Sequence, residues 1–155
     1  MASFRSEARF YLAKRRKFRY DLAMAKYHTG SHTKHRLQYH LVWIPKYRRR
    51  VLRGKMVISL KKLMYEACRI NKWWISELSI QEDHMHLIIQ TKPEDSVAEV
   101  AQRLKGGTSR VIRKEYPELE EFLWGNSFWA YGYFAETVGN VDEEVVRRYI
   151  REQRR

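Results

Sequence analysis

The sequence predicts an α+β fold in which an antiparallel sheet carries two helices on one face. Three observations support this. Segments rich in β-branched and aromatic residues alternate with segments whose apolar residues recur with a helical period. Two of the strand-like segments are separated by only a short turn, which favours a hairpin. The chain of 155 residues is long enough to fold as one domain with a sizeable core.

The first strand and the first helix are predicted in the amino-terminal half of the chain. Residues 36–44 are rich in β-branched, aromatic and leucine residues, and Pro45 ends the strand. Residues 55–71 are predicted to be helical, because apolar residues such as Leu60 and Met64 recur on one face and charged residues stay outside it.

The next two strands are predicted to form the hairpin. Residues 73–80 make the first strand, residues 81–83 the turn, and residues 84–90 the second strand. Successive side chains of a strand point to opposite faces. His84 and His86 are therefore expected on one face, and the apolar residues between and after them on the other.

A second helix is predicted to begin at Ser96, which forms a capping box with Glu99 three residues later. Residues 105–109 contain two consecutive glycines, and we expect them to interrupt or loosen this helix. Pro117 ends it.

An aromatic strand follows at residues 127–138, with an expected bend or bulge at Gly132. Asn140 is the predicted N-cap of the last helix, in which Tyr149 and Gln153 lie four residues apart and so share a face. The resulting order, strand–helix–strand–strand–helix–strand, is that of ferredoxin-like and RRM-like folds. The terminal helix is expected to cover the sheet face that carries the two histidines.

The charge of the chain indicates the class of partner. The formal net charge of +13 favours a polyanion, most simply nucleic acid. An anionic membrane surface is the alternative, but the sequence has neither a long uncharged apolar run nor a lipidation motif. Residues 1–34 are interpreted as a basic extension, either a nucleic-acid-binding arm or a solvated tail, and residues 35–155 as the folded domain. The lone Cys68 is expected in the core, which fits a reducing, cytoplasmic setting.

The histidine pair of the hairpin is half of a possible divalent-metal site, and a third ligand has to come from elsewhere. The alternative is a pair of half-buried polar residues at a strand end. His28, His32 and His35 form a looser cluster without an acidic or thiol neighbour, which disfavours a metal site there. His40, alone on the first strand, is interpreted as structural.

Several segments, in order along the chain, together resemble one known family. They are YHLVW (39–43), PKYR (45–48), DHMH (83–86), LKG (104–106), LWGNSFW (123–129), YFAETVG (133–139) and YIREQ (149–153). From about Lys34 to Gln153 the chain resembles the single-tyrosine HUH transposases, the TnpA proteins of insertion sequences that move as single-stranded DNA. It is also similar to the REP-associated tyrosine transposases. HUH denotes two histidines separated by a hydrophobic residue.

The resemblance implies a site and a reaction. His84, His86 and Gln153 would bind a divalent metal, Mg²⁺ or alternatively Mn²⁺, and Tyr149 would be the nucleophile. Asp83 would orient His84 by accepting a hydrogen bond, unless it is only a turn residue. The family's reaction cleaves and rejoins single-stranded DNA at transposon ends through a covalent 5′-phosphotyrosine, without a nucleotide cofactor.

The resemblance also implies partners. The substrate would be single-stranded DNA with hairpin ends, handled by the HUH transposase catalytic domain at residues 35–155. A homodimer is expected, in which the terminal helix serves its own subunit's histidines or the partner's. No membrane partner is expected, and the setting is the cytoplasm, at the nucleoid when DNA is bound. The basic residues assigned to DNA contact are Lys46, Arg48, Arg49, Lys105, Arg110 and Arg151.

Two other functions stay open at this point. One is a domesticated repeat-associated nuclease with the same chemistry, and the other is a non-catalytic RRM-like module for single-stranded nucleic acid. An RRM-like module would carry aromatic residues on its central strands, where this chain has His84 and His86. Tyr131 and Tyr133 are rival nucleophiles, but the aromatic strand that contains them predicts a core position for both.

Overall fold

The computed structural model describes residues 27–121, 123–139 and 143–153. The basic segment before Tyr27 and the predicted N-cap Asn140 lie outside the described residues. The chain divides into two units between Arg36 and Leu37.

The described part of the amino-terminal unit is a short hairpin. β1 (His28–Thr29) pairs antiparallel with β2 (Lys34–His35). The imidazoles of His28 and His35 are cross-strand neighbours, with ring centroids 6.2 Å apart, and His32 lies exposed in the turn. Within the described ranges, no group of three His, Cys, Asp or Glu side chains is placed to hold a metal ion.

The larger unit is built on a four-stranded antiparallel sheet with the strand order β4-β5-β3-β6. β3 (Leu37–Trp43) and β5 (Met85–Thr91) are its central strands. β4 (Trp74–Ile80) and β6 (Phe134–Thr137) form the two edges. The predicted hairpin is thus confirmed, because β4 and β5 pair directly.

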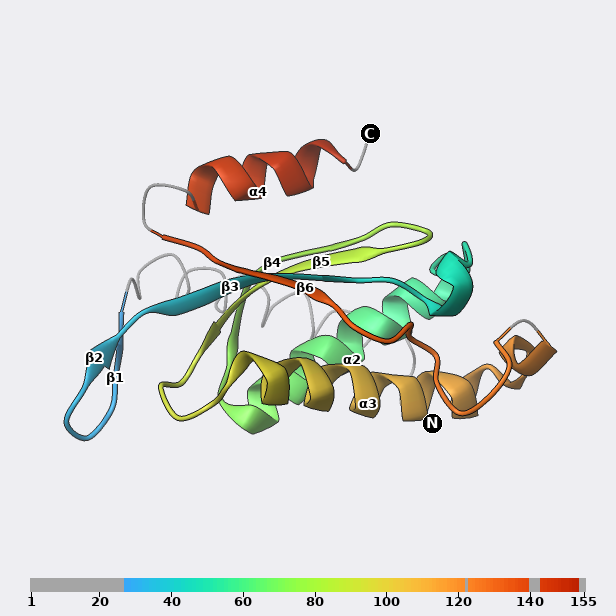
Figure 1. The fold of residues 1–155 in the computed structure, drawn as a ribbon, viewed down its shortest axis with the longest axis horizontal. Helices are drawn as coiled ribbons and strands as arrows, with labels where there is room; N and C mark the ends of the chain where they lie inside the picture. Colours follow the sequence, from blue (N-terminus) through green and yellow to red (C-terminus); the bar gives the residue numbers. More distant parts are fainter. Residues whose placement is uncertain (1–26, 122, 140–142, 154–155) are drawn as a thin grey trace, which may run out of the picture. The chain divides into compact units, whose positions relative to one another are not determined.

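Helices lie on both faces of the sheet. α2 (Lys55–Asn71) and α3 (Val97–Glu115) cover one face, and α4 (Glu143–Glu152) lies over the other (Figure 1). Two short 3-10 helices, η1 (Lys46–Arg48) and η2 (Pro117–Glu121), belong to the connections. The predicted α+β fold of the ferredoxin-like or RRM-like type, with two helices on one face and a terminal helix added, is confirmed. None of the described helices combines the length and the apolar character needed to cross a membrane.

The core lies between the sheet and the α2–α3 layer. Leu41 and Trp43 of β3 and Leu87 of β5 alternate into it, where Met64 of α2 and Leu104 of α3 meet them. All five side chains are at most 2% exposed. Burying side chains of this size contributes about 1.5–3 kcal/mol each, so this layer fixes the sheet that carries the histidines.

The opposite face of the sheet is buried but polar. Its polar residues are Gln38, His40, Ser79, His86 and Gln90. Ile150 of α4 is fully buried on this side of the molecule, outside the main core cluster. Arg151 of α4 also pairs with Glu77 of β4, with 3.6 Å between Nε and Oε2. The terminal helix therefore covers the histidine face, as the pattern predicted.

α3 corrects one sequence-based expectation. The prediction that residues 105–109 interrupt or loosen the helix is wrong, because α3 runs unbroken through both glycines. The Thr108 hydroxyl donates to the Leu104 carbonyl at 2.6 Å, and Leu104, Thr108 and Ile112 are all buried. A glycine costs a helix about 1 kcal/mol relative to alanine, which the burial of this apolar face exceeds.

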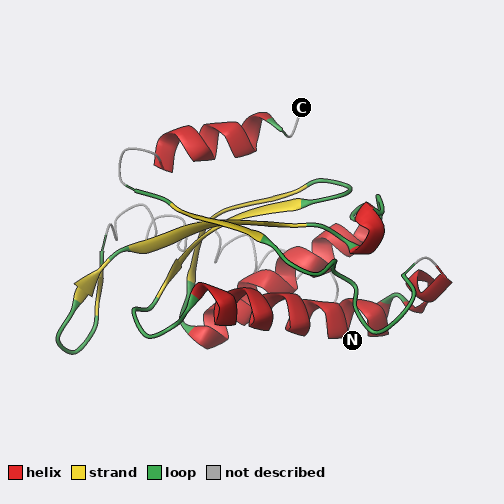
Figure 2. Ribbon diagram, viewed as in Figure 1, coloured by secondary structure: helices red, strands yellow, loops and turns green. Residues whose placement is uncertain are grey.

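The aromatic strand is shorter than predicted. Residues 134–137 form β6, whereas residues 127–133 form a loop (Figure 2). Gly132 has a φ of +78°, a left-handed conformation that favours glycine. The ammonium group of Lys105 donates to the carbonyls of Ala130 at 2.8 Å and Gly132 at 2.6 Å. A side chain of α3 therefore satisfies these carbonyls in place of a neighbouring strand.

The loop also changes the positions of its tyrosines. Tyr131 is 99% exposed and Tyr133 is 39% exposed, so the prediction that both lie in the core is wrong. The prediction assumed that both tyrosines lie in a strand, but residues 127–133 form a loop. Side chains alternate between core and surface only where the backbone is extended and paired.

Candidate active site

Two histidines stand side by side where the β4–β5 turn enters β5. His84 lies just before the strand and His86 within it, and their rings meet edge to face with centroids 5.1 Å apart. β5 is hydrogen-bonded on both sides, so its backbone is fixed by two neighbours. The imidazoles are thus presented from one of the most constrained positions in the sheet.

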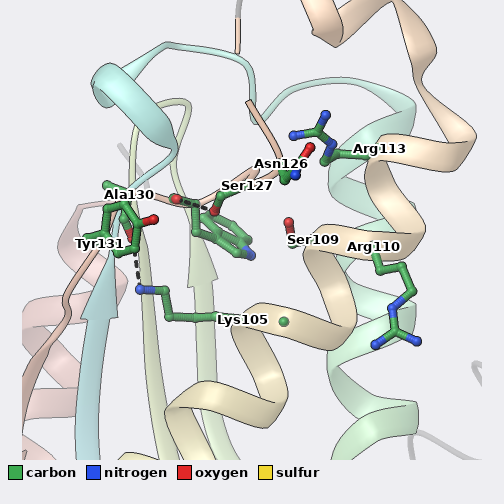
Figure 3. A pocket seen from close by; sticks show the side chains of 10 residues that line it. Lys105, Ser109, Arg110, Arg113, Asn126, Ser127, Ala130 and Tyr131 are labelled. Atoms are coloured by element: carbon green, nitrogen blue, oxygen red, sulfur yellow. Dashed lines mark hydrogen bonds between the residues drawn. The ribbon is translucent and has the colours of Figure 1, made fainter. Parts of the chain in front are cut away.

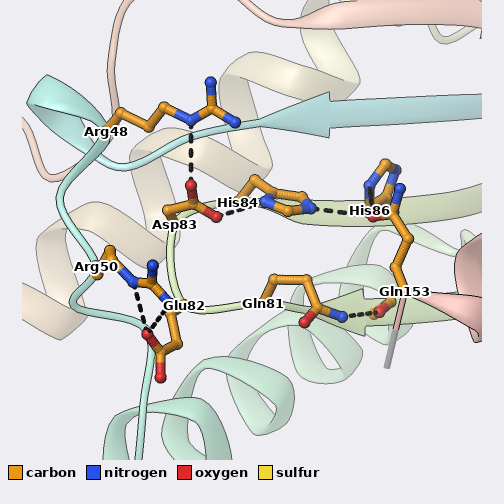
Figure 4. A network of polar contacts seen from close by, with 9 residues as sticks. Arg48, Arg50, Gln81, Glu82, Asp83, His84, His86 and Gln153 are labelled. Carbon is orange, nitrogen blue, oxygen red and sulfur yellow. Dashed lines mark hydrogen bonds and ion pairs between the residues drawn. The ribbon is translucent and has the colours of Figure 1, made fainter. Parts of the chain in front are cut away.

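α4 brings a third donor to the pair. The Oε1 atom of Gln153 lies 3.1 Å from Nε2 of His84 and 3.0 Å from Nε2 of His86, all within one chain (Figure 4). Neighbouring ligands of an octahedral Mg²⁺, each about 2.1 Å from the ion, lie about 3.0 Å from one another. An amide oxygen with two imidazole nitrogens also suits Mg²⁺ or Mn²⁺ by ligand type. The two distances from Gln153 to the histidines therefore match the spacing of neighbouring ligands on such an ion.

The second nitrogen of His84 is held by a carboxylate. Its Nδ1 lies 2.6 Å from Oδ1 of Asp83, and Oδ2 of the same carboxylate accepts from Nε of Arg48 at 3.1 Å (Figure 4). The hydrogen bond with His84 is the main cause that lowers the pKa of Asp83, and burial opposes it. An ionised Asp83 can accept the Nδ1 proton of His84, which would leave the Nε2 lone pair of His84 free for a metal.

His86 has a different partner. Its Nδ1 lies 3.0 Å from Nε2 of His40, and Nδ1 of His40 lies 2.7 Å from Oε1 of Glu136. Burial is the first cause that lowers the pKa of His86 to about 4, and the neighbouring His40 and His84 lower it further. His86 is therefore neutral, as a metal ligand must be, over most of the accessible pH range.

Tyr149 stands beside this cluster. Its ring is perpendicular to the ring of His86, with centroids 6.0 Å apart, and the residue is 52% exposed. It precedes Gln153 by four residues, so both side chains leave the same face of α4. A phenol is thus held next to the histidine–glutamine cluster and remains open to a substrate.

A separate polar pocket lies between α3 and the loop that precedes β6. Its volume is about 430 Å³, and Figure 3 shows the side chains that surround it. The lining includes the cations Lys105, Arg110 and Arg113 and no acidic residue, with Asn126 and the exposed Tyr131 also contributing. The chemistry of this lining suits a phosphate with an adjoining planar group.

A sequence profile for the family described as Transposase IS200 like matches residues 33–153. The chain belongs to this family.

Characterised relatives agree with this membership. The ISDra2 transposase TnpA of Deinococcus radiodurans is 31% identical over 119 residues, which cover 77% of this chain and 85% of the relative. The transposase for insertion sequence element IS200 of Salmonella typhimurium is 28% identical over 123 residues, which cover 79% of this chain and 80% of the relative.

Solved structures share the fold of this IS200-like transposase. A candidate transposase from Deinococcus radiodurans R1 aligns with a TM-score of 0.68 and 27% identity, over 81% of this chain and 97% of that one. A REP-associated tyrosine transposase bound to a REP hairpin aligns with a TM-score of 0.59 and 13% identity, over 79% of this chain and 70% of that one. At this identity the second likeness shows the fold alone.

The basic residues assigned to DNA contact are spread over several parts of the IS200-like transposase. Arg48 contacts Asp83 behind the histidine pair, and Arg151 contacts Glu77 beside α4. Lys105 and Arg110 line the polar pocket, where burial lowers the pKa of Lys105. The other two are in or next to η1: Lys46 donates to the Trp124 carbonyl, and Arg49 is exposed.

Sequence reasoning missed three members of these sites. His40 was interpreted as structural and Glu136 received no role, yet both stand behind His86. Arg113 of the pocket was also missed. The alternation of side chains along β3 puts His40 on one face of the sheet. Only the pairing register of β3 with β5 shows that His40 lies next to His86.

Proposed function

We propose that this IS200-like transposase cleaves and rejoins single-stranded DNA at transposon ends, with Tyr149 as the nucleophile. The observation that carries the proposal is the convergence of His84, His86 and Gln153 within 3.1 Å, with the exposed Tyr149 ring beside them. Family membership supports a DNA-processing enzyme in preference to a non-catalytic RRM-like module.

The three donors would hold Mg²⁺ or Mn²⁺. Such an ion, when bound, supplies charge that polarises the scissile phosphate and offsets the negative charge of the transition state. The chain's own residues do the remaining work. Asp83 keeps the proton of His84 on Nδ1, and α4 presents the phenol and the amide from one face.

The chemical step balances without a further reactant. The phenolic oxygen of Tyr149 attacks the phosphorus, the bond from phosphorus to the 3′ oxygen breaks, and the proton lost by the phenol is matched by one gained at the 3′ oxygen. The products are a 5′-phosphotyrosine and a free 3′-hydroxyl. The covalent link conserves the ester bond, so a later 3′-hydroxyl reverses the step and joins a new strand.

The charge of the molecule supports single-stranded DNA as the substrate. The net charge of +13 favours a phosphate backbone, and the pocket at Lys105 and Arg110 has a lining suited to one. A protein of the same fold has been solved with a REP hairpin, which supports a hairpin as the recognised element. Action on DNA would place the protein in the cytoplasm at the nucleoid.

A homodimer completes the proposal, because one tyrosine per chain makes one strand cut and an excision needs two. The Gln153 side chain reaches the histidines of its own chain here, so each subunit holds a complete set of donors. An exchange of α4 between subunits would assemble the same set from two chains.

The first test looks for the covalent intermediate. Protein, Mg²⁺ and end-labelled single-stranded transposon-end DNA are incubated, and a protein–DNA adduct that survives SDS is resolved on a gel. Tyr149→Phe should abolish the adduct, at least 100-fold below the unsubstituted protein, and should retain DNA binding. The matched controls Tyr131→Phe and Tyr133→Phe should keep the adduct. Persistence of the adduct in Tyr149→Phe would show that another residue is the nucleophile.

A further inference from the structure

Each ring nitrogen of His86 faces a residue from another part of the fold. Its Nε2 faces Gln153, which directly follows α4, and its Nδ1 faces His40 of β3. The chain of contacts continues to Glu136 of β6, which is the direct cross-strand neighbour of His40. The rings of His40 and His86 are stacked, with centroids 5.2 Å apart and planes 13° from parallel.

One proton arrangement along this chain of contacts leaves the Nε2 of His86 available to a metal. A carboxylate only accepts, so His40 donates to Glu136 from Nδ1. When that is the single ring proton of His40, its Nε2 has a lone pair, which accepts the Nδ1 proton of His86. The Nε2 of His86 is left with a lone pair, directed to the point where Gln153 and His84 converge.

We propose that Glu136 and His40 are positioning residues that fix the tautomer and the ring orientation of His86, so that its Nε2 faces the metal position. This inference rests on the proposed function, because the metal position is part of it. The proposal also gives the two histidine ligands the same kind of support, since the Nδ1 of each is connected to a carboxylate by hydrogen bonds. His84 is tied directly to Asp83, and His86 is tied to Glu136 through His40.

The burial of the participants supports the assignment. His40 and His86 are each 5% exposed, so a ring nitrogen without a partner there would be out of reach of bulk water. Glu136, in contrast, sits on an exposed edge strand with its side chain 47% exposed. Its 2.7 Å contact with His40 is therefore not imposed by packing, and Glu136 can be replaced without disturbing the core.

The experiment compares two uncharged replacements of similar length. Glu136→Gln keeps a carbonyl oxygen that accepts from His40, whereas Glu136→Met keeps the shape and offers no such acceptor. The probe is Mn²⁺ alone, titrated into DNA-free protein and followed by the electron paramagnetic resonance signal of the free ion. We expect Glu136→Met to weaken Mn²⁺ binding by about 10-fold or more, and Glu136→Gln to stay within about 3-fold of the unsubstituted protein.

A control variant separates hydrogen bonding from loss of charge. Glu66→Met removes an exposed carboxylate from α2, which packs on the other face of the sheet, and should leave Mn²⁺ binding unchanged. Equal affinities in Glu136→Met and the unsubstituted protein would overturn the proposal. Equal weakening in Glu136→Gln and Glu136→Met would also overturn it, because charge alone would then explain the effect.

A second readout does not involve the metal. Nitrogen-15 NMR of the imidazoles in metal-free protein reports which ring nitrogen carries the proton. His86 should be protonated on Nδ1 in the unsubstituted protein and in Glu136→Gln, and should become a mixture in Glu136→Met. An unchanged His86 tautomer in Glu136→Met would refute the positioning role. This readout needs neither metal nor DNA, so it stands even if the Tyr149 adduct experiment fails.

Discussion

His84 and His86 differ in what lies behind them. Asp83 holds His84 directly, while His86 reaches a carboxylate only through the ring of His40. His86 is also the more deeply buried, and that burial is the first reason why its pKa is lowered to about 4. At the scale of single residues, the site aims the same nitrogen of both imidazoles at Gln153.

The lowered pKa of His86 predicts how stability changes with pH. The unfolded chain binds a proton at this imidazole with a pKa near 6.5, whereas the folded protein does so only near pH 4. The unfolded state therefore holds more protons between these values. The metal-free protein should lose up to about 3 kcal/mol of unfolding free energy as pH falls from 6.5 to 4, and this contribution should be complete above pH 6.5.

Urea unfolding of EDTA-treated protein at several pH values measures this effect. His86→Gln should flatten the dependence between pH 6.5 and pH 4. His32→Gln is the matched control, because it removes an exposed imidazole from the β1–β2 turn and should keep the original slope. An unchanged slope in His86→Gln would mean that other groups cause the acid sensitivity.

α3 shows how an element overrides a local signal. Its amino terminus follows the sequence closely, with Ser96 and Glu99 forming the predicted capping box. Its middle does not, since two glycines stay helical under the packing of Leu104 and Ile112. The same helix supplies Lys105, whose ammonium group donates to two carbonyls of the 127–133 loop.

The continuity of α3 predicts opposite effects for two alanine substitutions. Gly107→Ala should stabilise the protein by about 0.5–1 kcal/mol, because the position is helical and an added Cβ meets no atom within 4 Å. Gly132→Ala should destabilise it by about 1 kcal/mol, because Gly132 has a φ of +78° although its surroundings are equally open. Thermal or urea unfolding measures both. Destabilisation by Gly107→Ala would contradict an unbroken helix.

At the scale of the whole molecule, two chemically distinct regions lie on the same framework. The histidine–glutamine cluster and Tyr149 lie on the sheet face that α4 covers. The cationic pocket lies between α3 and the 127–133 loop. Both regions belong to the same compact unit, which begins at Leu37.

The pocket predicts a local contribution to DNA affinity beyond the net charge. Arg110→Gln should weaken single-stranded DNA binding several-fold and reduce the salt slope of log K by about 0.7, the value for one phosphate contact. Arg69→Gln is the charge-matched control, since it removes an exposed cation from α2 that is paired with Glu66. Fluorescence anisotropy across a salt series measures both. Equal losses in the two variants would mean that the pocket adds nothing to the overall charge.

The sequence by itself determined the order of the main elements and the fold class, and it predicted the grouping of the candidate residues. The alternation along β5 and the four-residue spacing of Tyr149 and Gln153 are local periodicities. Such periodicities can be recognised in the sequence without knowledge of tertiary contacts. The length of α2 and the capping box of α3 follow from the same kind of signal.

Only the tertiary structure decided what stands behind His86, where the aromatic segment leaves the sheet, and which side chains form the pocket. His40 and Glu136 lie 96 residues apart and meet because β6 pairs with β3 in one register. A shift of that register by one residue would turn Glu136 to the other face. Such contacts depend on how strands and helices pack. The packing energy depends on residues that are distant in the sequence, so a single segment does not predict it.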